Sequence, residues 1–332
     1  MIKLLRTKIV KVFLATIIIS SIGISVPFHS IASTYINENT LMRDIKSNPS
    51  IAEENIYLYD PASESTNGSL TLTQFLAKTT PNGSYLAKEC AEGLNSIISN
   101  HDKGITVNLK IYNDMEILLD ATKQNVGLYY FPAPNPGAKF VVICPGGAYA
   151  DVAVTQEGMS MAAAFNRLGY SAFVLRYRVG LFDAVPKNYP QDDLARAIFY
   201  IRSNADALKV NPNNYAVAGC SAGGHLAATW GLEYDKYFLP KPATLMLHYA
   251  WCSFMFVPSK VTTSYPSTFM DIGKNDGLSI DLDYTAMKNA LIAKEIPNQC
   301  TLYENAPHSN CTGTGTDAEG WITRACQFWE QQ

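Results

Sequence analysis

From residue 105 onward, short apolar runs alternate with segments whose apolar residues recur at helical spacing. The runs are rich in β-branched and aromatic residues and predict strands over 105–112, 126–133, 139–147, 171–180, 214–221, 243–251, 267–276 and 299–306. The segments between them predict helices over 158–169, 191–208, 223–232, 284–295 and 317–332. Near-continuous apolar strands alternating with helices are typical of an α/β fold with a mostly parallel central sheet and helices on both faces. Residues 105–332 are therefore predicted to form the main domain.

The N-terminal residues show a different pattern. Basic residues precede an apolar run at 12–26, and small residues follow it near Ala32 and Ser33. This order predicts a secretory signal over residues 1–33, with export from the cytoplasm and no stable membrane anchoring. An uncleaved anchor is the alternative, but the run is shorter than the ~20 residues that span a bilayer.

Residues 34–104 are polar and rich in Ser, Asn, Thr and Glu, with helix-like pieces at 72–78 and 87–100. They are predicted to be an N-terminal extension. The sequence does not indicate its role, and both a packed extension and a partial cover over an active site remain open.

Composition narrows the function classes. The chain has 332 residues, of which 47% are hydrophobic, so it can bury one large core. Its net charge of -3 gives no basic field that would attract nucleic acid.

Seven cysteines are an odd number, so at least one thiol stays unpaired within a single chain. Cys144, Cys220 and Cys300 lie in apolar strand-like runs and are interpreted as buried structural residues. No CxxC or Cys/His spacing is present, so neither a metal nor a cofactor is predicted.

The segment Gly219-Cys220-Ser221-Ala222-Gly223 fits the pattern G-x-S-x-G, between a predicted strand and a predicted helix. In such an elbow the serine occupies a strained turn, and the residues two before and two after it must be small. The turn raises the hydroxyl above the sheet at a helix N-terminus, where developing negative charge is favoured. Ser221 is therefore the predicted nucleophile. A tight turn with an incidental serine is the alternative.

A serine nucleophile needs a base. Past the signal segment the histidines are His101, His225, His248 and His308, and the chain order Ser, acid, His favours His308, which follows the last predicted strand. His225, four residues after Ser221, is interpreted as a support for the turn. His248, within a strand, is interpreted as a core histidine with a satisfied side chain.

The acid is expected after the penultimate strand. Asp276 lies just beyond that strand and can orient His308, and it is favoured over Asp271 within the strand. Asp281 and Asp283 are interpreted as the N-cap region of the next helix.

Amide donors for an oxyanion are expected from two places. One is Ala222, which follows the nucleophile, and the others are Gly147 and Ala148, in the glycine-containing loop after the third predicted strand. The alternative for that loop is a glycine turn that only closes the strand.

Five segments, at 144–158, 169–180, 219–228, 273–277 and 304–310, together resemble the α/β-hydrolase superfamily, in its esterase/lipase branch with bacterial acetyl-xylan and other carbohydrate esterases. Two positions depart from the usual pattern. Pro145-Gly146-Gly147-Ala148 stands where many relatives have His-Gly-Gly-Gly, and His308-Ser309 stands where many have His-Gly. The resemblance implies ester hydrolysis through an acyl-enzyme, on a small-molecule or carbohydrate ester.

The sequence thus predicts a metal-free carboxylic-ester hydrolase. A serine peptidase of the same fold is one alternative, although the long N-terminal region typical of the oligopeptidase type is missing. A noncatalytic binding protein that kept the fold is another. Because residues 252–266 are too few for a helical lid with its own apolar face, a preference for acetyl to butyryl groups is expected.

Overall fold

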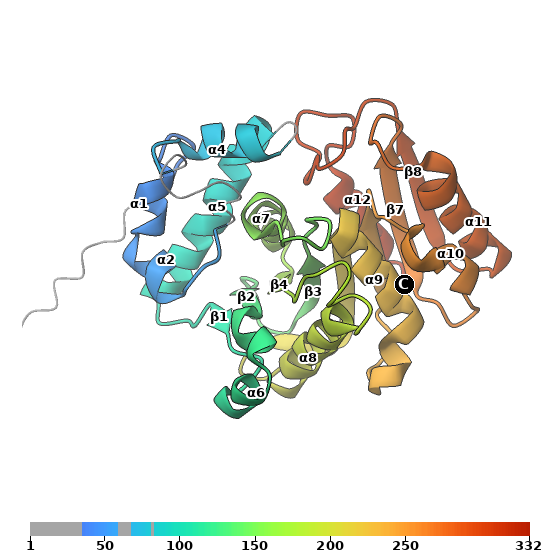
Figure 1. Ribbon diagram of the computed structural model, residues 1–332, viewed down its shortest axis with the longest axis horizontal. Coiled ribbons are helices and arrows are strands. Elements are labelled where there is room, and N and C mark those ends of the chain that lie inside the picture. Colours follow the sequence, from blue (N-terminus) through green and yellow to red (C-terminus); the bar gives the residue numbers. More distant parts are fainter. Residues whose placement is uncertain (1–34, 59–67, 81–82) are drawn as a thin grey trace, which may run out of the picture. The chain divides into compact units, whose positions relative to one another are not determined.

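The computed structural model describes residues 35–58, 68–80 and 83–332, and in these one eight-stranded sheet has the order β1-β2-β4-β3-β5-β6-β7-β8 (Figure 1). The strands are β1 (Asn108–Leu109), β2 (Gly127–Phe131), β3 (Ala138–Cys144), β4 (Ser171–Arg176), β5 (Val210–Cys220), β6 (Thr244–His248), β7 (Ser267–Gly273) and β8 (Asn298–Tyr303). The predicted signal segment lies outside the described residues.

The sheet is antiparallel at one edge and parallel elsewhere. β2 pairs antiparallel with both β1 and β4, whereas the pairs from β4 through β3, β5, β6 and β7 to β8 are parallel. The carboxyl ends of β3, β5, β6, β7 and β8 therefore meet at the same end of the sheet. In open α/β sheets, ligand sites form outside these ends.

Helices cover both faces of the sheet. The longer ones of the main domain are α7 (Met159–Arg167), α8 (Tyr189–Ser203), α9 (Ser221–Glu233), α11 (Ala286–Ala293) and α12 (Trp321–Trp329), with the short α6 (Asp114–Leu119) and α10 (Val257–Lys260) in loops. α12 packs against α7, and α8 packs against α9. With both faces covered, every residue of β2 and β6 is buried, including the polar Thr244 and His248 at the ends of β6.

The first predicted strand, 105–112, is longer than the strand observed. The ladder with β2 contains only β1, although the N–H of Tyr130 also donates to the carbonyl oxygen of Val107. The carboxylate of Glu54 accepts the backbone N–H groups of Val107 and Asn108 at 3.1 and 2.8 Å, so a side chain from the N-terminal region satisfies amides of this edge strand. This long-range contact could not be inferred from local pattern.

The N-terminal region is helical and shares the main core. It contains α1 (Met42–Lys46), α2 (Pro49–Glu53), α4 (Leu72–Thr79) and α5 (Gly83–Asp102). α5 packs against α4 and α7, and its Leu94 and Ile97 are buried in the same apolar cluster as the sheet. In the first half of α5, Glu89 accepts hydrogen bonds from Thr312 and Thr314 in the loop after β8. The extension therefore contacts the segment that carries His308.

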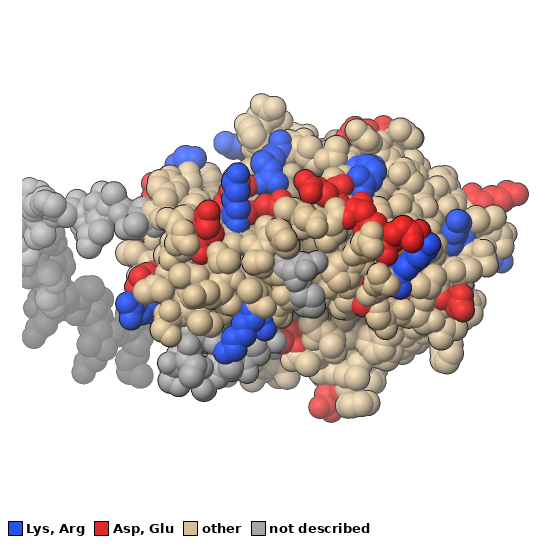
Figure 2. All heavy atoms as spheres, turned by 90° about the horizontal axis from the view of Figure 1, so that it is seen from above, with Lys and Arg blue, Asp and Glu red and all other residues tan. Residues whose placement is uncertain are grey.

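Side chains of both charges share one face of the molecule. On the face drawn in Figure 2, basic and acidic side chains are interspersed. Among the described residues, no helix is both long enough and apolar enough to cross a membrane. All seven cysteines are unpaired; Cys144 and Cys220 are fully buried within strands, and Cys300 is half-buried.

Candidate active site

Ser221 lies at the junction of β5 and α9, at the carboxyl end of the sheet. Its φ of 52° is left-handed, which is uncommon for a residue with a side chain. A Cβ at Gly219 would lie 2.2 Å from the carbonyl oxygen of Gly223, and one at Gly223 would lie 2.0 Å from that of Cys144. The strand and helix can approach this closely only because both positions are glycine.

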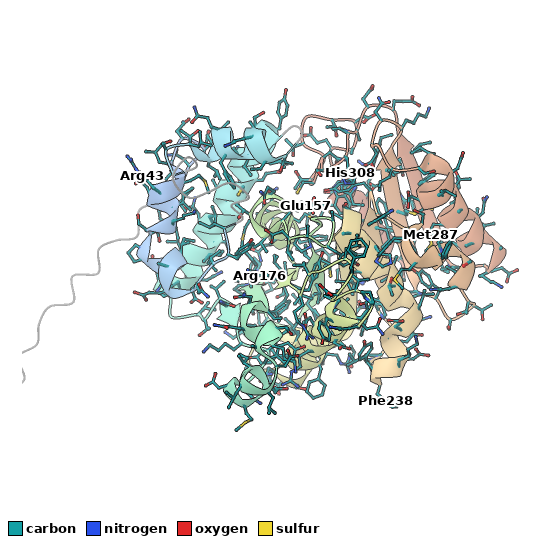
Figure 3. The ribbon with its side chains drawn as sticks, viewed as in Figure 1. Arg43, Glu157, Arg176, Phe238, Met287 and His308 are labelled. Carbon is teal, nitrogen blue, oxygen red and sulfur yellow. The ribbon has the colours of Figure 1, made fainter. Side chains whose placement is uncertain are left out.

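The structure brings Ser221, His308 and Asp276 into one hydrogen-bonded chain. Nε2 of His308 is 2.9 Å from Oγ of Ser221, and Nδ1 of His308 is 2.8 Å from Oδ1 of Asp276. Asp276 follows β7 and His308 follows β8, and both loops project from the carboxyl end of the sheet (Figure 3). The hydroxyl thus has a base within hydrogen-bond reach, and the base has a carboxylate that orients it.

The electrostatics of His308 suit proton transfer. Burial disfavours its charged form, but the hydrogen bond from its ring to Asp276 and the negative charge of that carboxylate outweigh burial and raise the pKa of His308 above its ordinary value. A raised pKa makes an imidazole a stronger acceptor for the proton of a neighbouring hydroxyl.

The loop after β3 presents amides beside Ser221. Gly147 has a φ of 129°, and Ala148 and Tyr149 have φ values of 54° and 55°. No described residue accepts a hydrogen bond from the N–H groups of Gly147 or Ala148, nor from that of Ala222 in the first turn of α9. These three amides are therefore available to a ligand.

The same loop is held by side chains from distant elements. Tyr149 OH lies 2.7 Å from Nδ1 of His225 on α9, and Tyr177 OH donates to the carbonyl oxygen of Pro145 at 2.6 Å. Burial, followed by the positive charge of Lys260, lowers the pKa of His225 to about 4, so this imidazole is neutral at pH 7. His225 supports the loop through Tyr149, whereas the sequence suggested a support for the elbow turn.

His248 and Asp271 form a second, separate pair. Both side chains are fully buried, with Nδ1 of His248 2.5 Å from Oδ1 of Asp271. Tyr303 OH donates to the other oxygen of Asp271, and Nε2 of His248 lies 2.9 Å from Oδ1 of Asn310. His248 is thus a core histidine with both ring nitrogens partnered, as expected. Asp271 is engaged there, and His308 is oriented by Asp276.

Asp281 and Asp283 lie in the first turn of the helical segment after β7, the N-cap region in which they were expected, although neither is the N-cap residue itself. Ser279 caps the π-helical turn η5 (Ile280–Thr285), and buried Asp283 accepts the N–H groups of Ser253 and Ser279. Asp283 therefore ties together the loops after β6 and β7. Asp281 is exposed.

Three residues near the site were missed from the sequence. Glu157 is a buried carboxylate that accepts the N–H of Gly146, and Tyr249 donates its hydroxyl to Glu157. Trp251 donates its backbone N–H to the carbonyl oxygen of Ser221, and its ring stacks on Phe254 at 4.4 Å. Of these three, only Glu157 had a signal in the sequence, because it is an acidic residue at the otherwise apolar start of a predicted helix.

No group of three or more His, Cys, Asp or Glu side chains that could hold a metal occurs in the part of the chain that the structure describes. The groups assembled around Ser221 are a hydroxyl, an imidazole, a carboxylate and backbone amides. Together they can carry out acyl transfer by nucleophilic attack on a carbonyl carbon.

Comparison with known proteins places this arrangement in context. The sequence matches the BD-FAE family over residues 128–306, more than half of the chain. It is 33% identical over 98 residues to an acetylxylan esterase of Xylanibacter ruminicola, covering 30% of this chain and 20% of that protein. The chain therefore matches about a fifth of the length of this curated relative.

Solved structures share the fold. An acetyl ester-xyloside bifunctional hydrolase from Caldicellulosiruptor lactoaceticus has a TM-score of 0.60 and 21% identity, over 68% of this chain and 95% of that one. MGS-M1, an α/β hydrolase from a Medee basin deep-sea metagenome library, has a TM-score of 0.55 and 23% identity, over 68% and 96%. The predicted α/β-hydrolase fold is confirmed.

Proposed function

Because the chain belongs to the BD-FAE family of esterase-type α/β hydrolases, we propose that it is an exported serine esterase that removes short acyl groups, acetyl above all, from carbohydrate esters. The observation that carries this proposal is the continuous hydrogen-bonded chain from Ser221 Oγ through His308 to Asp276. Close to it lie three amides with no partner among the described residues.

The reaction follows from the geometry in two halves. Oγ of Ser221 attacks the ester carbonyl while Nε2 of His308 takes its proton, and Asp276 stabilises the imidazolium that forms. His308 then returns the proton to the leaving alcohol oxygen as the C–O bond breaks, which leaves an acyl group on Ser221. A water molecule, deprotonated by His308, attacks that acyl group, and the proton passes back to Oγ of Ser221 as the acid departs.

The negative oxygen formed in each half needs donors that are already in place. The amides of Gly147, Ala148 and Ala222 are proposed for this role. They lie on a loop and a helix start that the surrounding side chains hold rigidly, so little reorganisation is required during the reaction.

Two observations support a carbohydrate leaving group and a short acyl group. The named relatives include an acetylxylan esterase. The half-buried rings of Trp251 and Phe254 stack on each other, and the backbone N–H of Trp251 donates to the carbonyl oxygen of Ser221; these rings are proposed as an apolar surface for a sugar ring. The segment 252–266 forms only a three-residue 3-10 turn (Phe254–Phe256) and the four-residue α10. Neither is long enough to shelter an extended acyl chain.

Labelling with a fluorophosphonate probe tests the nucleophile. The wild-type chain and Ser259→Ala, a control at an exposed serine on α10, should be labelled, whereas Ser221→Ala should not. The same proteins are then assayed on acetylated xylo-oligosaccharides, simple aryl esters and peptide substrates. Hydrolysis of peptides but not esters would favour a serine peptidase, and absence of labelling would favour a noncatalytic binding protein.

Export is proposed from the signal pattern over residues 1–33. Expression in the native host should yield a chain outside the cytoplasm that begins shortly after Ala32 or Ser33. Edman sequencing of the recovered protein measures this directly. A chain that still begins at Met1 and sediments with membranes would indicate an uncleaved anchor.

A further inference from the structure

Glu157 is a buried acidic side chain that has no role in the reaction proposed above. It lies in the π-helical turn η2 (Val154–Gly158), immediately before α7, with 3% of its surface exposed. No Lys, Arg or His of the described residues forms an ion pair with it, and burial raises its pKa. A charged group kept in the interior at such a cost calls for a specific role.

One oxygen of Glu157 holds the oxyanion loop. Oε2 accepts the backbone N–H of Gly146 at 2.5 Å. A Cβ at Gly146 would lie 2.9 Å from Cβ of Ser221 and 3.1 Å from Oε2 of Glu157, so this residue is enclosed between the nucleophile and the carboxylate. The next residue, Gly147, carries the first amide proposed to bind the oxyanion. The bond from Glu157 therefore fixes the start of the loop directly against Ser221.

The other oxygen holds the histidine side of the site. Oε1 accepts the hydroxyl proton of Tyr249 at 3.0 Å, and the same hydroxyl oxygen accepts the N–H of Cys311 at 3.2 Å. The ring of Tyr249 lies 5.0 Å from that of His308, at 62°. Its backbone carbonyl also accepts the N–H of Ser221 at 3.1 Å. Tyr249 thus contacts the nucleophile, the base and the loop that carries the base.

We propose that Glu157 is a positioning residue that sets the oxyanion loop and the His308 loop relative to Ser221, through Gly146 on one side and Tyr249 on the other. Figure 3 shows Glu157 and His308 in the same region, and Tyr249 bridges them. The inference rests on the proposed esterase function and adds a fourth side chain to its machinery.

The carboxylate form of Glu157 satisfies both contacts. Both of its oxygens accept hydrogen bonds, one from an amide and one from a phenol, and a carboxylate can do this whereas a glutamine cannot. In Glu157→Gln, the NH₂ group must face either the Gly146 N–H or the Tyr249 hydroxyl. The first places two donors together, and the second forces the tyrosine proton to another acceptor. The hydrogen bond to one of the two loops is then lost, or it is reversed in direction and leaves the tyrosine proton without this acceptor.

The charge of Glu157 also acts on His308. The groups that face this imidazole are Asp276, in direct contact, and Glu157 and Asp283 farther away, and all three favour its protonated form. Loss of the charge at Glu157 should therefore lower the pKa of His308, and activity should persist to lower pH. A residue that only stabilised the fold would not shift the pH profile in this way.

The test compares Glu157→Gln with two other variants of the full chain. Tyr249→Phe removes only the hydroxyl link and keeps the ring against His308. Glu89→Gln is the matched control, because Glu89 accepts hydrogen bonds from Thr312 and Thr314, beyond His308 in the chain, but forms none with Tyr249 or with the oxyanion loop. For each variant, kcat and KM for an acetyl ester, the pH profile of kcat/KM, the melting temperature and the rate of fluorophosphonate labelling are measured.

Glu157→Gln should lower kcat by on the order of 10²-fold, the effect of losing one oxyanion donor, with KM within about three-fold of wild type. The acidic limb of its pH profile should move to lower pH. Tyr249→Phe should show a smaller loss of kcat, and Glu89→Gln should change kcat by less than about three-fold. A kcat for Glu157→Gln close to wild type, or an equal loss in Glu89→Gln, would overturn the proposal, as would an unmoved acidic limb.

Labelling separates this inference from the proposed function. If the wild type reacts with the probe but hydrolyses no ester, the substrate assignment fails, and slower labelling of Glu157→Gln still supports the positioning role. If the wild type neither reacts nor hydrolyses esters, both proposals fail together. If Glu157→Gln does not fold, Tyr249→Phe decides, because wild-type kcat in that variant would contradict a link from Glu157 to His308.

Discussion

Asp276 and Asp271 provide a matched pair of carboxylates, since each holds a different histidine. In Asp276→Asn, the amide has two possible orientations. Oδ1 of Asp276 accepts both the ring of His308 at 2.8 Å and the N–H of Leu278 at 3.2 Å, while its buried Oδ2 has no partner among the described residues. An NH₂ group facing His308 forces the proton onto Nε2, so the ring cannot accept the proton of Ser221. An NH₂ group in place of Oδ2 keeps the tautomer but removes the charge that stabilises the imidazolium.

Either orientation reduces the stabilisation of the transition state and so lowers kcat. Loss of the correct tautomer costs about 10⁴ in kcat in other triads, which corresponds to ~5.5 kcal/mol at 1.36 kcal/mol per tenfold change. We expect a loss of about this size in Asp276→Asn. The melting temperature should move by only a few degrees, because the replaced side chain keeps its shape and one of its oxygens had no partner.

Asp271→Asn should give the opposite pattern. It breaks the buried pair with His248 and weakens the acceptor for Tyr303 OH, which should destabilise the fold by ~3 kcal/mol. Its kcat should fall by no more than about tenfold, since Asp271 does not contact His308. Steady-state hydrolysis of an aryl acetate and thermal unfolding measure both effects. A larger loss of kcat in Asp271→Asn than in Asp276→Asn would refute the assignment; if Asp271→Asn does not fold, Tyr303→Phe probes the same pair more mildly.

Three further outcomes are expected. Because His308 must be neutral to accept a proton and its pKa is raised, kcat/KM should fall as the pH drops through a value above the ordinary one of about 6.5; a limb below about pH 6 in a pH series would contradict this. Ser221→Ala and His308→Ala should each lower kcat by on the order of 10⁴–10⁶, and the double variant should lose little more, since triad members act as a unit; additive losses in the same assay would argue against a shared step. For aryl esters of two to twelve carbons, kcat/KM should peak between acetyl and butyryl, because each methylene gains about 0.8 kcal/mol only where a pocket buries it; a maximum at eight carbons or more would reveal a long apolar channel.

Most main-domain elements were predictable because their patterns are local, although the predicted first strand over 105–112 is reduced to β1. The run before Ser221 and the helix after it lie where the sequence placed them, as β5 and α9. The partners of Asp271 and Glu157 could not be predicted in the same way. Asp271 meets His248 because β6 and β7 are in a register that sets these two residues side by side. Glu157 meets Gly146 and Tyr249 only after a turn, a loop and a strand end have come together, and no sequence spacing encodes that meeting.

The loop after β3 lacks the third glycine that many relatives have, and long-range contacts take over the role of that glycine in shaping the loop. Ala148 and Tyr149 both adopt left-handed φ values, which cost on the order of 1–3 kcal/mol each for residues with side chains. Glycine would relieve that cost but would leave a loop with more conformational freedom to lose. In this loop the hydroxyl of Tyr149 is held by His225, and the hydrogen bond from the N–H of Gly146 to Glu157 fixes the start of the loop. The bulky residue is thus compatible with a rigid row of amides because the fold supplies partners on α9 and η2, and rigid amides are what an oxyanion requires.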